Sequence, residues 1–227
     1  MRSSIGYEIR RLACVFALIL VSAAAAGAPV SIVNASFESP VLGDGGFTTA
    51  SIDGCSYSGS VAHGVFNPTP SGLVSPPDGA QVAFLDGGGT VVSVTQTLSA
   101  VLAAGESYVL EADFAYRINC CLTPTFTLAL LAGGSPVASV TGGPGDGFSN
   151  TAFKTATVNF TAPAAGPQLG TALGIRISMT GATNEQIVFD NVRINASPVP
   201  LPASGLLLAP ALGWLARRRV RAGDADA

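Results

Sequence analysis

Apolar and polar residues alternate along most of the chain between Val30 and Ala196, and turn residues separate the alternating stretches. The clearest stretch is ESYVLEADFAYR at 106–117, where every second residue from Tyr108 to Tyr116 is apolar or aromatic. A period of two that is rich in aromatic side chains predicts a β-strand with one buried face. The same alternation recurs in FTLALLAGG, FKTATVNFTAP, ALGIRISMTG and QIVFDNVRI.

The number and spacing of these stretches predict an all-β domain over residues 29–196. No segment keeps a sustained helical period. Eight or more short strands separated by turns are typical of an antiparallel β-sandwich of jelly-roll type. Earlier in the chain, AQVAFLDGGGTVVSVTQTL predicts two strands joined at a glycine turn around 87–89.

Composition and charge narrow the possible partners. The chain has 227 residues, of which 11% are charged and 48% hydrophobic, so it can form one medium domain with processing segments beside it. Between Gly27 and Pro202, four basic residues stand against eleven acidic ones, a net charge of −7. An acidic surface repels phosphate backbones, so nucleic acid is excluded as a partner, whereas divalent cations suit such a domain.

Residues 1–26 have the three parts of a secretory signal peptide. Arg2, Arg10 and Arg11 form a basic start, 12–21 is apolar, and small residues lead to a predicted cleavage by signal peptidase after Ala26. The alternative is an uncleaved anchor helix. Cleavage is favoured because the apolar run is shorter than the roughly 20 residues that a membrane span needs.

Residues 198–221 form a second processing segment. Its main part is VPLPASGLLLAPALGWLARRR. The hydrophobic stretch at 205–216 would form a helix of only ~18 Å, against a hydrocarbon core of ~30 Å. A cluster of arginines that stays in the cytoplasm follows it; its members are Arg217, Arg218, Arg219 and Arg221. This pattern predicts a short helix that anchors an exported domain transiently in the inner membrane.

This tail resembles the PEP-CTERM sorting signal of Gram-negative bacteria, in its VPLPA form. The motif residues are Val199, Pro200, Leu201, Pro202 and Ala203, and Leu201 stands where the commoner form has Glu. The resemblance implies processing by an exosortase. It also implies export through the inner membrane to the cell surface or the extracellular space.

The central domain resembles carbohydrate-binding-like, galactose-binding-like jelly rolls. IVNASFESP is similar to their opening, and IVFDNVRI is similar to their final strand. The resemblance implies that the first and last strands are neighbours, and that Glu38 and Asp190 bind one structural calcium ion together with backbone carbonyls. The alternative is that both acids are solvated at strand ends. One observation favours calcium: Asp190 lies in an otherwise apolar strand, where an unpaired charge is costly.

Three cysteines remain after removal of the signal peptide. In an oxidising compartment they predict one disulfide and one free thiol, with Cys55 paired to Cys120 or Cys121. A strained bridge between Cys120 and Cys121 is the third arrangement. NCCL lacks the spacing of zinc ligands.

Other chemistry is sparse. His63 is the chain's one histidine and is expected to be an ordinary loop residue. Glu111 and Asp113 are two apart on one strand face, as a glycosidase pair could be, but such acids are usually solvated. Three aromatic residues in loop-like stretches are candidates for stacking on sugars, although aromatics in a sandwich are more often core; they are Tyr57, Phe66 and Phe148.

The sequence therefore predicts a non-enzymatic exported protein, processed by an exosortase, with a structural or adhesive role in an exopolysaccharide matrix or biofilm. The alternative is a calcium-supported glycan-binding module or an extracellular glycan-active enzyme.

Overall fold

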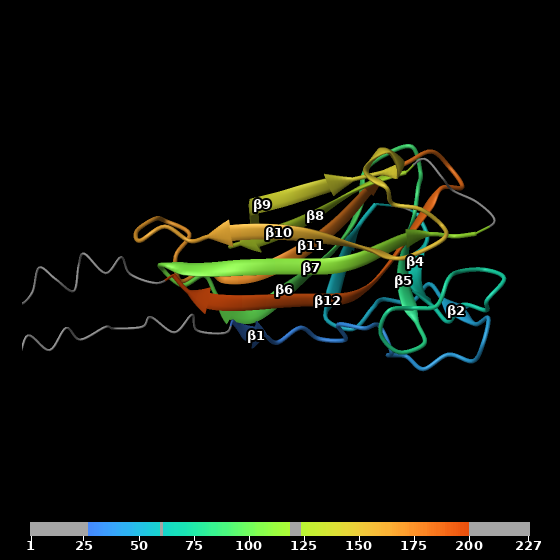
Figure 1. Cartoon of the computed structure of the whole chain (residues 1–227), viewed down its shortest axis with the longest axis horizontal. Helices are drawn as coiled ribbons and strands as arrows, with labels where there is room; N and C mark the ends of the chain where they lie inside the picture. The colour runs from blue at the N-terminus through green and yellow to red at the C-terminus, as the bar shows by residue number, and fades with distance from the viewer. Residues whose placement is uncertain (1–26, 60, 119–123, 200–227) are drawn as a thin grey trace, which may run out of the picture. The chain divides into compact units, whose positions relative to one another are not determined.

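The computed structural model describes residues 27–59, 61–118 and 124–199 (Figure 1). Seven strands form one antiparallel sheet: β1 (Ala28–Val30), β2 (Phe47–Thr48), β4 (His63–Phe66), β5 (Val82–Asp86), β7 (Glu106–Tyr116), β10 (Lys154–Thr161) and β12 (Gln186–Pro198). Five form the other: β3 (Cys55–Ser58), β6 (Val92–Val101), β8 (Thr125–Ala132), β9 (Ser135–Gly142) and β11 (Ala172–Thr180). One short 3-10 helix, η1 (Pro144–Asp146), follows β9.

The two sheets face each other as a β-sandwich, which confirms the predicted fold class. The strand order is β10-β7-β12-β5-β4-β2 in the seven-stranded sheet, with β1 also paired to β12, and β3-β6-β11-β8-β9 in the five-stranded sheet. The first and last strands are therefore neighbours, as the jelly-roll resemblance implied. Ala28 lies opposite Ala196 in this pair.

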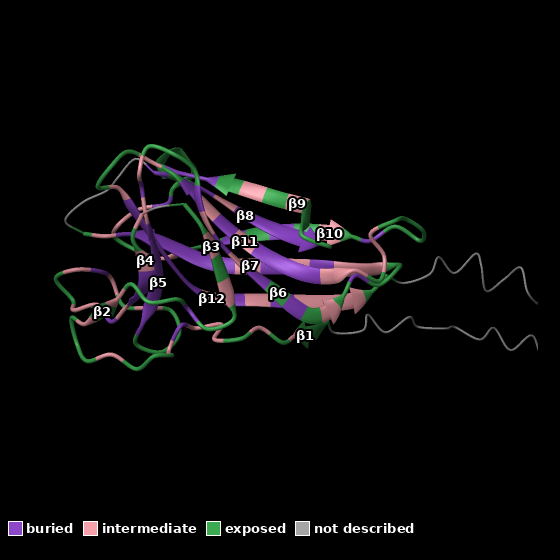
Figure 2. Cartoon of the chain, turned by 180° about the vertical axis from the view of Figure 1, so that it is seen from behind, coloured by how far each residue is buried: buried purple, intermediate pink, exposed green. Residues whose placement is uncertain are grey.

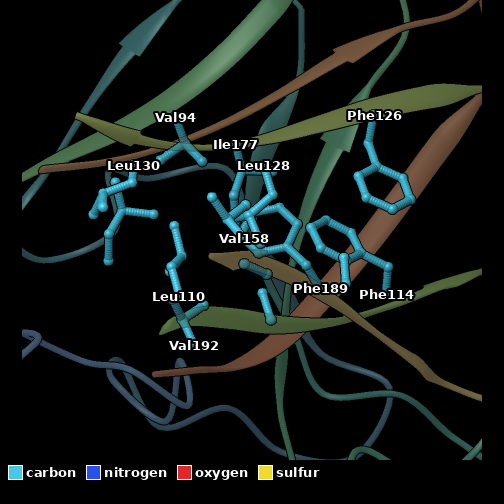
Figure 3. Packing of buried hydrophobic residues seen from close by; sticks show 14 of the residues in the cluster. Val94, Leu110, Phe114, Phe126, Leu128, Leu130, Val158, Ile177, Phe189 and Val192 are labelled. Atoms are coloured by element: carbon cyan, nitrogen blue, oxygen red, sulfur yellow. The ribbon is translucent and has the colours of Figure 1, made fainter. Parts of the chain in front are cut away.

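The core between the sheets is built from the alternating strands (Figure 3). In β7, the predicted inward residues Leu110, Ala112 and Phe114 are fully buried. Phe114 stacks on Phe126 from β8, with 3.8 Å between ring centroids. Aromatic pairs of this kind add about 0.5–1.5 kcal/mol beyond the area they bury.

Strand β5 is buried on both faces, as is the start of β12 that pairs with it (Figure 2). Ala83 and Leu85 pack in the main core, whereas Val82 and Phe84 join a second apolar cluster on the outer face of the sheet. Successive side chains of a strand point to opposite faces. The outer face of the seven-stranded sheet is therefore apolar where β4, β5 and β12 meet.

The predicted glycine turn at 87–89 exists, but it joins strands in different sheets. β5 pairs with β4 and β12, and β6 pairs with β3 and β11. The glycines do not close a hairpin because Gly87 N–H donates to Glu185 O and Gly89 N–H donates to Gly181 O. A Cβ on Gly87 would also overlap backbone oxygens of 181–182. The turn is therefore bound to the β11–β12 loop.

The predicted signal peptide and most of the sorting segment, 200–221 with its proline motif and arginines, lie outside the described residues. Cleavage after Ala26 and export to the cell surface stay predictions. Among the described residues, we find no helix with the length and apolar character that a membrane crossing requires.

Candidate active site

A pocket opens on the outer face of the seven-stranded sheet, beside β2, β4 and β5. Figure 1 shows these three strands together at one end of the sheet. Its volume is about 310 Å³. We call it the Asp86 pocket, and its lining residues are Gly45, Phe47, Thr49, Ala62, Phe66, Phe84, Asp86, Arg117 and Gln186. Pockets of at least about 300 Å³ with aromatic walls and few polar groups are typical of small-molecule sites.

Strand register brings these residues together from distant parts of the chain. Phe47 of β2 lies opposite Phe66 of β4, and Asp86 of β5 lies opposite Gln186 of β12. Phe84 and Asp86 are two residues apart on β5 and therefore share its outer face. The same face carries an apolar wall and a carboxyl group.

A glycine allows β2 to close the pocket. Gly64 of β4 has φ +156°, and a Cβ there would overlap the carbonyl oxygen of Thr48. Only glycine permits so close a backbone approach. The Phe47 wall therefore depends on Gly64.

The Asp86 carboxyl is half-buried and has a raised pKa. Burial disfavours its charged form, while a hydrogen bond donated by Gln186 Nε2 and the charge of Arg117 act in the opposite direction. The net effect is an increase of the pKa above the ordinary value. A carboxyl group that holds its proton at higher pH is suited to act as a general acid.

Arg117 follows β7 directly and lies over a wall of the pocket. Its guanidinium carbon is 5.3 Å from the centroid of the Phe66 ring, a cation–π contact. The ion pairs found within the described residues both belong to Arg193. Arg117 therefore brings a positive charge to the pocket without a carboxylate at ion-pair distance in that part of the chain.

Three carboxylates gather beside the start of β5. Asp190 is fully buried and accepts hydrogen bonds from the backbone N–H groups of Asp78 and Asn191, at 3.0 and 2.6 Å. Glu38 Oε1 accepts from two backbone N–H groups at 80–81, both at 2.8 Å. The net pKa of Asp190 is raised to about 7. Burial is the largest cause, the two backbone hydrogen bonds act against it, and the charges of Asp78 and Glu38 add to the increase.

The structure thus brings the predicted pair Glu38 and Asp190 into one environment and adds Asp78. A bulge positions Asp190, because the register of β12 shifts between Asp190 and Arg193. Asp78 was missed since it stands in a Pro-Pro-Asp-Gly sequence that indicates only a turn. Within 27–59, 61–118 and 124–199, no three or more His, Cys, Asp or Glu side chains lie in a group that could hold a metal ion.

The three aromatic candidates have different roles. Phe66 lines the Asp86 pocket. Phe148 is a core residue, 7% exposed, and its ring meets the stacked rings of Phe114 and Phe126 edge-on. The Tyr57 hydroxyl accepts a hydrogen bond from a backbone N–H, and its ring stacks on His63 with 3.6 Å between centroids. His63 is therefore a strand residue with a stacking partner and not a loop residue.

Glu111 and Asp113 are held in an ion-pair network on the outer face of the seven-stranded sheet. Arg193 lies 3.0 Å from Glu111 and 3.4 Å from Asp113. Asp113 is only 6% exposed and also accepts hydrogen bonds from Thr155 and Asn191. The expectation that these acids are solvated is wrong for Asp113, since its oxygens are occupied by neighbouring side chains.

Cys55 is half-buried in β3 and forms no disulfide with another described residue. Burial raises the pKa of its thiol; a hydrogen bond from Gln96 lowers it, and the charge of Asp53 raises it. Cys120 and Cys121 lie outside the described residues, so the pairing of Cys55 stays a prediction.

Comparison with known proteins points to ring-forming enzymes. The HpiC1-like family, described as HpiC1 cyclase, matches residues 28–195. A Stig cyclase, Fisc from Fischerella sp. TAU in complex with (3Z)-3-(1-methyl-2-pyrrolidinylidene)-3H-indole, is 26% identical with a TM-score of 0.65. A cyclase from Fischerella sp. TAU in complex with 4-(1H-indol-3-yl)butan-2-one is 26% identical with a TM-score of 0.66. Each match covers 77% of this chain and 100% of the other.

A carbohydrate-binding module shares the fold. The CBM22-1 xylan-binding domain of Paenibacillus barcinonensis Xyn10C is 14% identical with a TM-score of 0.50, and the match covers 78% of this chain and all of that domain. This likeness supports the jelly-roll resemblance for the fold alone. No curated protein matches the chain.

These findings overturn the predicted non-enzymatic role. Because the cyclase family matches residues 28–195, the predicted structural or adhesive role in a matrix or biofilm is wrong. The same match argues against the two alternatives, a glycan-binding module and a glycan-active enzyme. A small-molecule substrate replaces exosortase and exopolysaccharide as the expected partners, while cleavage by signal peptidase stays a prediction. The prediction failed because the motifs at the first and last strands identify the jelly-roll fold. They carry no information about the pocket residues, most of which come from other strands.

Proposed function

The chain belongs to the HpiC1-like cyclase family, and on this premise we propose that it closes a ring in a small, largely apolar molecule held in the Asp86 pocket. One observation carries the placement: a carboxyl group with a raised pKa lies among three phenylalanine side chains. The indole ligands of the two Fischerella structures support a flat aromatic ring as part of the bound molecule.

The proposed reaction is an isomerisation driven by proton transfer. The protonated Asp86 carboxyl donates its proton to a carbon–carbon double bond of the substrate. A second π bond of the same molecule attacks the resulting cation, and this forms the ring bond. Loss of a proton to the Asp86 carboxylate then restores the acid, so substrate and product have the same atoms and electrons.

The pocket side chains support each of these steps. Gln186 donates a hydrogen bond to Asp86 and so orients the carboxyl group. The faces of Phe47 and Phe84 can stabilise the developing cation, because the face of an aromatic ring is negative. Apolar walls also keep water away from that cation and prevent its capture as an alcohol.

Conversion of alkenyl indoles tests this proposal. The purified chain is incubated with a panel of indoles that carry an alkenyl side chain, and products of unchanged mass and altered retention are identified by chromatography. We expect Asp86→Asn to lower the rate at least about 100-fold, in line with general acid catalysis. Asp86→Glu should retain part of it. An Asp86→Asn variant as fast as the wild type would refute the assignment.

We further infer that Glu38 and Asp190, together with nearby backbone carbonyls, hold one structural calcium ion. Calcium prefers carboxylate and carbonyl oxygens, which are the groups present here. A fully buried carboxylate close to two others needs a compensating positive charge. When bound, the ion supplies that charge; the residues themselves tie the Glu38 loop to the start of β5 and to β12.

A further inference from the structure

Arg117 has a charge that no side chain in the described part of the chain neutralises by an ion pair. Arg193 is paired with Glu111 and Asp113, and Arg176 donates to the carbonyl oxygen of Gly134. Within 27–59, 61–118 and 124–199, the contact found for the Arg117 guanidinium is the Phe66 ring. Burying part of a cation at a pocket without a partner is unfavourable.

The contact with Phe66 also leaves the N–H donors of Arg117 available to a ligand. A guanidinium is planar and carries five N–H donors in its plane, and contact through its face does not consume them. Two of these donors match the two oxygens of a carboxylate in a bidentate pair. Asp86 does not fill this role, since its carboxyl accepts from Gln186 and forms no ion pair with Arg117.

The rings that line the rest of the pocket favour a ligand with an apolar part. Phe84 is 5% exposed at the pocket floor, and Phe47 is 68% exposed and so leaves apolar surface uncovered. A ligand that covers these rings and also meets Arg117 must have an apolar part and an anionic part.

We propose that the natural ligand of the Asp86 pocket is a carboxylate-bearing aromatic molecule whose carboxylate pairs with Arg117. The inference rests on the proposed function, because it concerns the same pocket. It differs from the neutral ketone seen in the Fischerella complex. A carboxylate held by Arg117 also offsets the guanidinium charge that opposes protonation of Asp86, so binding and acid strength are coupled.

Two ligands of almost the same shape test the proposal. The first is 4-(1H-indol-3-yl)butan-2-one, and the second is 3-(1H-indol-3-yl)propionate, in which a carboxylate oxygen replaces the ketone's methyl group. Calorimetric titration of the full chain with each gives the two affinities. We expect the propionate to bind about tenfold more tightly than the ketone, and its advantage to shrink as salt screens the charge.

Substitutions assign the preference to one residue. Arg117→Met keeps an unbranched apolar stem against Phe66 and removes the charge; it should lower propionate affinity about tenfold and leave ketone affinity within about twofold. Arg176→Met, on the five-stranded sheet, is the matched control and should change neither. Equal binding of both ligands by the wild type, or equal weakening of both by Arg117→Met, overturns the carboxylate assignment. Failure of both ligands to bind the wild type instead overturns the proposed pocket.

Discussion

Two pockets of similar size show why one of them is a better candidate for catalysis. The second, which we call the Lys154 pocket, has a volume of about 330 Å³ and lies where β9 and β10 meet at the edge of the sandwich. Its lining residues are Phe126, Val140, Thr141, Gly142, Asp146, Phe148, Lys154, Thr155, Ala156 and Thr157. Each pocket has a cation over a phenylalanine, at 5.3 Å for Arg117 on Phe66 and 5.0 Å for Lys154 on Phe148.

The pockets differ in what their polar groups already bind. In the Lys154 pocket, the ammonium group donates to the carbonyl oxygen of Asp146, and the Asp146 carboxylate accepts from Gly143 N–H at 3.0 Å. Thr155 donates to Asp113 on the neighbouring strand. These groups close a turn and join strands. In the Asp86 pocket, by contrast, the Asp86 carboxyl group, whose pKa is raised, and the Arg117 side chain line the cavity. Volume and aromatic walls alone therefore do not identify a site.

Glycine substitutions in the two pockets should separate catalysis from stability. Gly64→Ala places a Cβ against the Thr48 carbonyl and so forces β2 and Phe47 away from the Asp86 pocket. We expect ligand affinity and conversion to fall at least about 30-fold, a larger loss than a one-methyl change in a packed pocket usually causes. Calorimetry and the conversion assay measure it.

Gly142→Ala is the matched change in the Lys154 pocket. Its Cβ would overlap the rings of Phe126 and Phe148, so it should cost about 1–3 kcal/mol of unfolding free energy by overpacking. Conversion by the folded protein should stay within about twofold. If Gly142→Ala abolished conversion and Gly64→Ala did not, the Lys154 pocket would be the better candidate.

The sequence predicted the sandwich because its signal is local. The alternation at 106–117 depends only on consecutive residues, and the structure buries Leu110 and Phe114 as expected. Asp190 was also found locally, as a charge within an apolar strand. Its partner Asp78 could not be found this way, since the contact joins residues 112 apart in the chain.

The Asp86 pocket could not be predicted because it depends on register between distant strands. Asp86 ends a short apolar run and precedes three glycines, so its sequence context indicates a turn. Nothing local shows that Gln186 lies opposite it, or that Arg117 reaches the same face. A continuous apolar run in VAFLD was the available signal, because such runs are typical of strands buried on both faces.

Calcium should stabilise the side of the sandwich that carries the Asp86 pocket and leave the other side unchanged. The carboxylate cluster leads directly into β5, which forms the pocket floor. In the described part of the chain, β9 and β10 form no hydrogen bond with Glu38, Asp78 or Asp190. In hydrogen exchange, we expect calcium to slow exchange in β4 and β5 about tenfold or more, and to leave β9 within about twofold. Equal protection of both sides would contradict a local site.

The same cluster predicts how stability depends on pH. Without calcium, the pKa of Asp190 is about 7 in the folded protein, above its unfolded value near 4. The folded state then holds more protons between these values, so unfolding free energy falls as pH rises from 4 to 7, by at most about 4 kcal/mol. Melting in chelator should show this fall, and calcium or Asp190→Asn should remove it. A melting temperature independent of pH in chelator would contradict the assignment.

The smallest expected effect is on the pH dependence of conversion. Because Asp86 acts as an acid, the rate should fall as pH rises through its raised pKa. The charge of Arg117 opposes protonation of Asp86, so Arg117→Met should move this fall to higher pH when a neutral substrate is used. Lys154→Met removes the corresponding cation of the other pocket and should not move it. A shift of equal size in both variants would mean that general surface charge, and not the geometry of the Asp86 pocket, sets the profile.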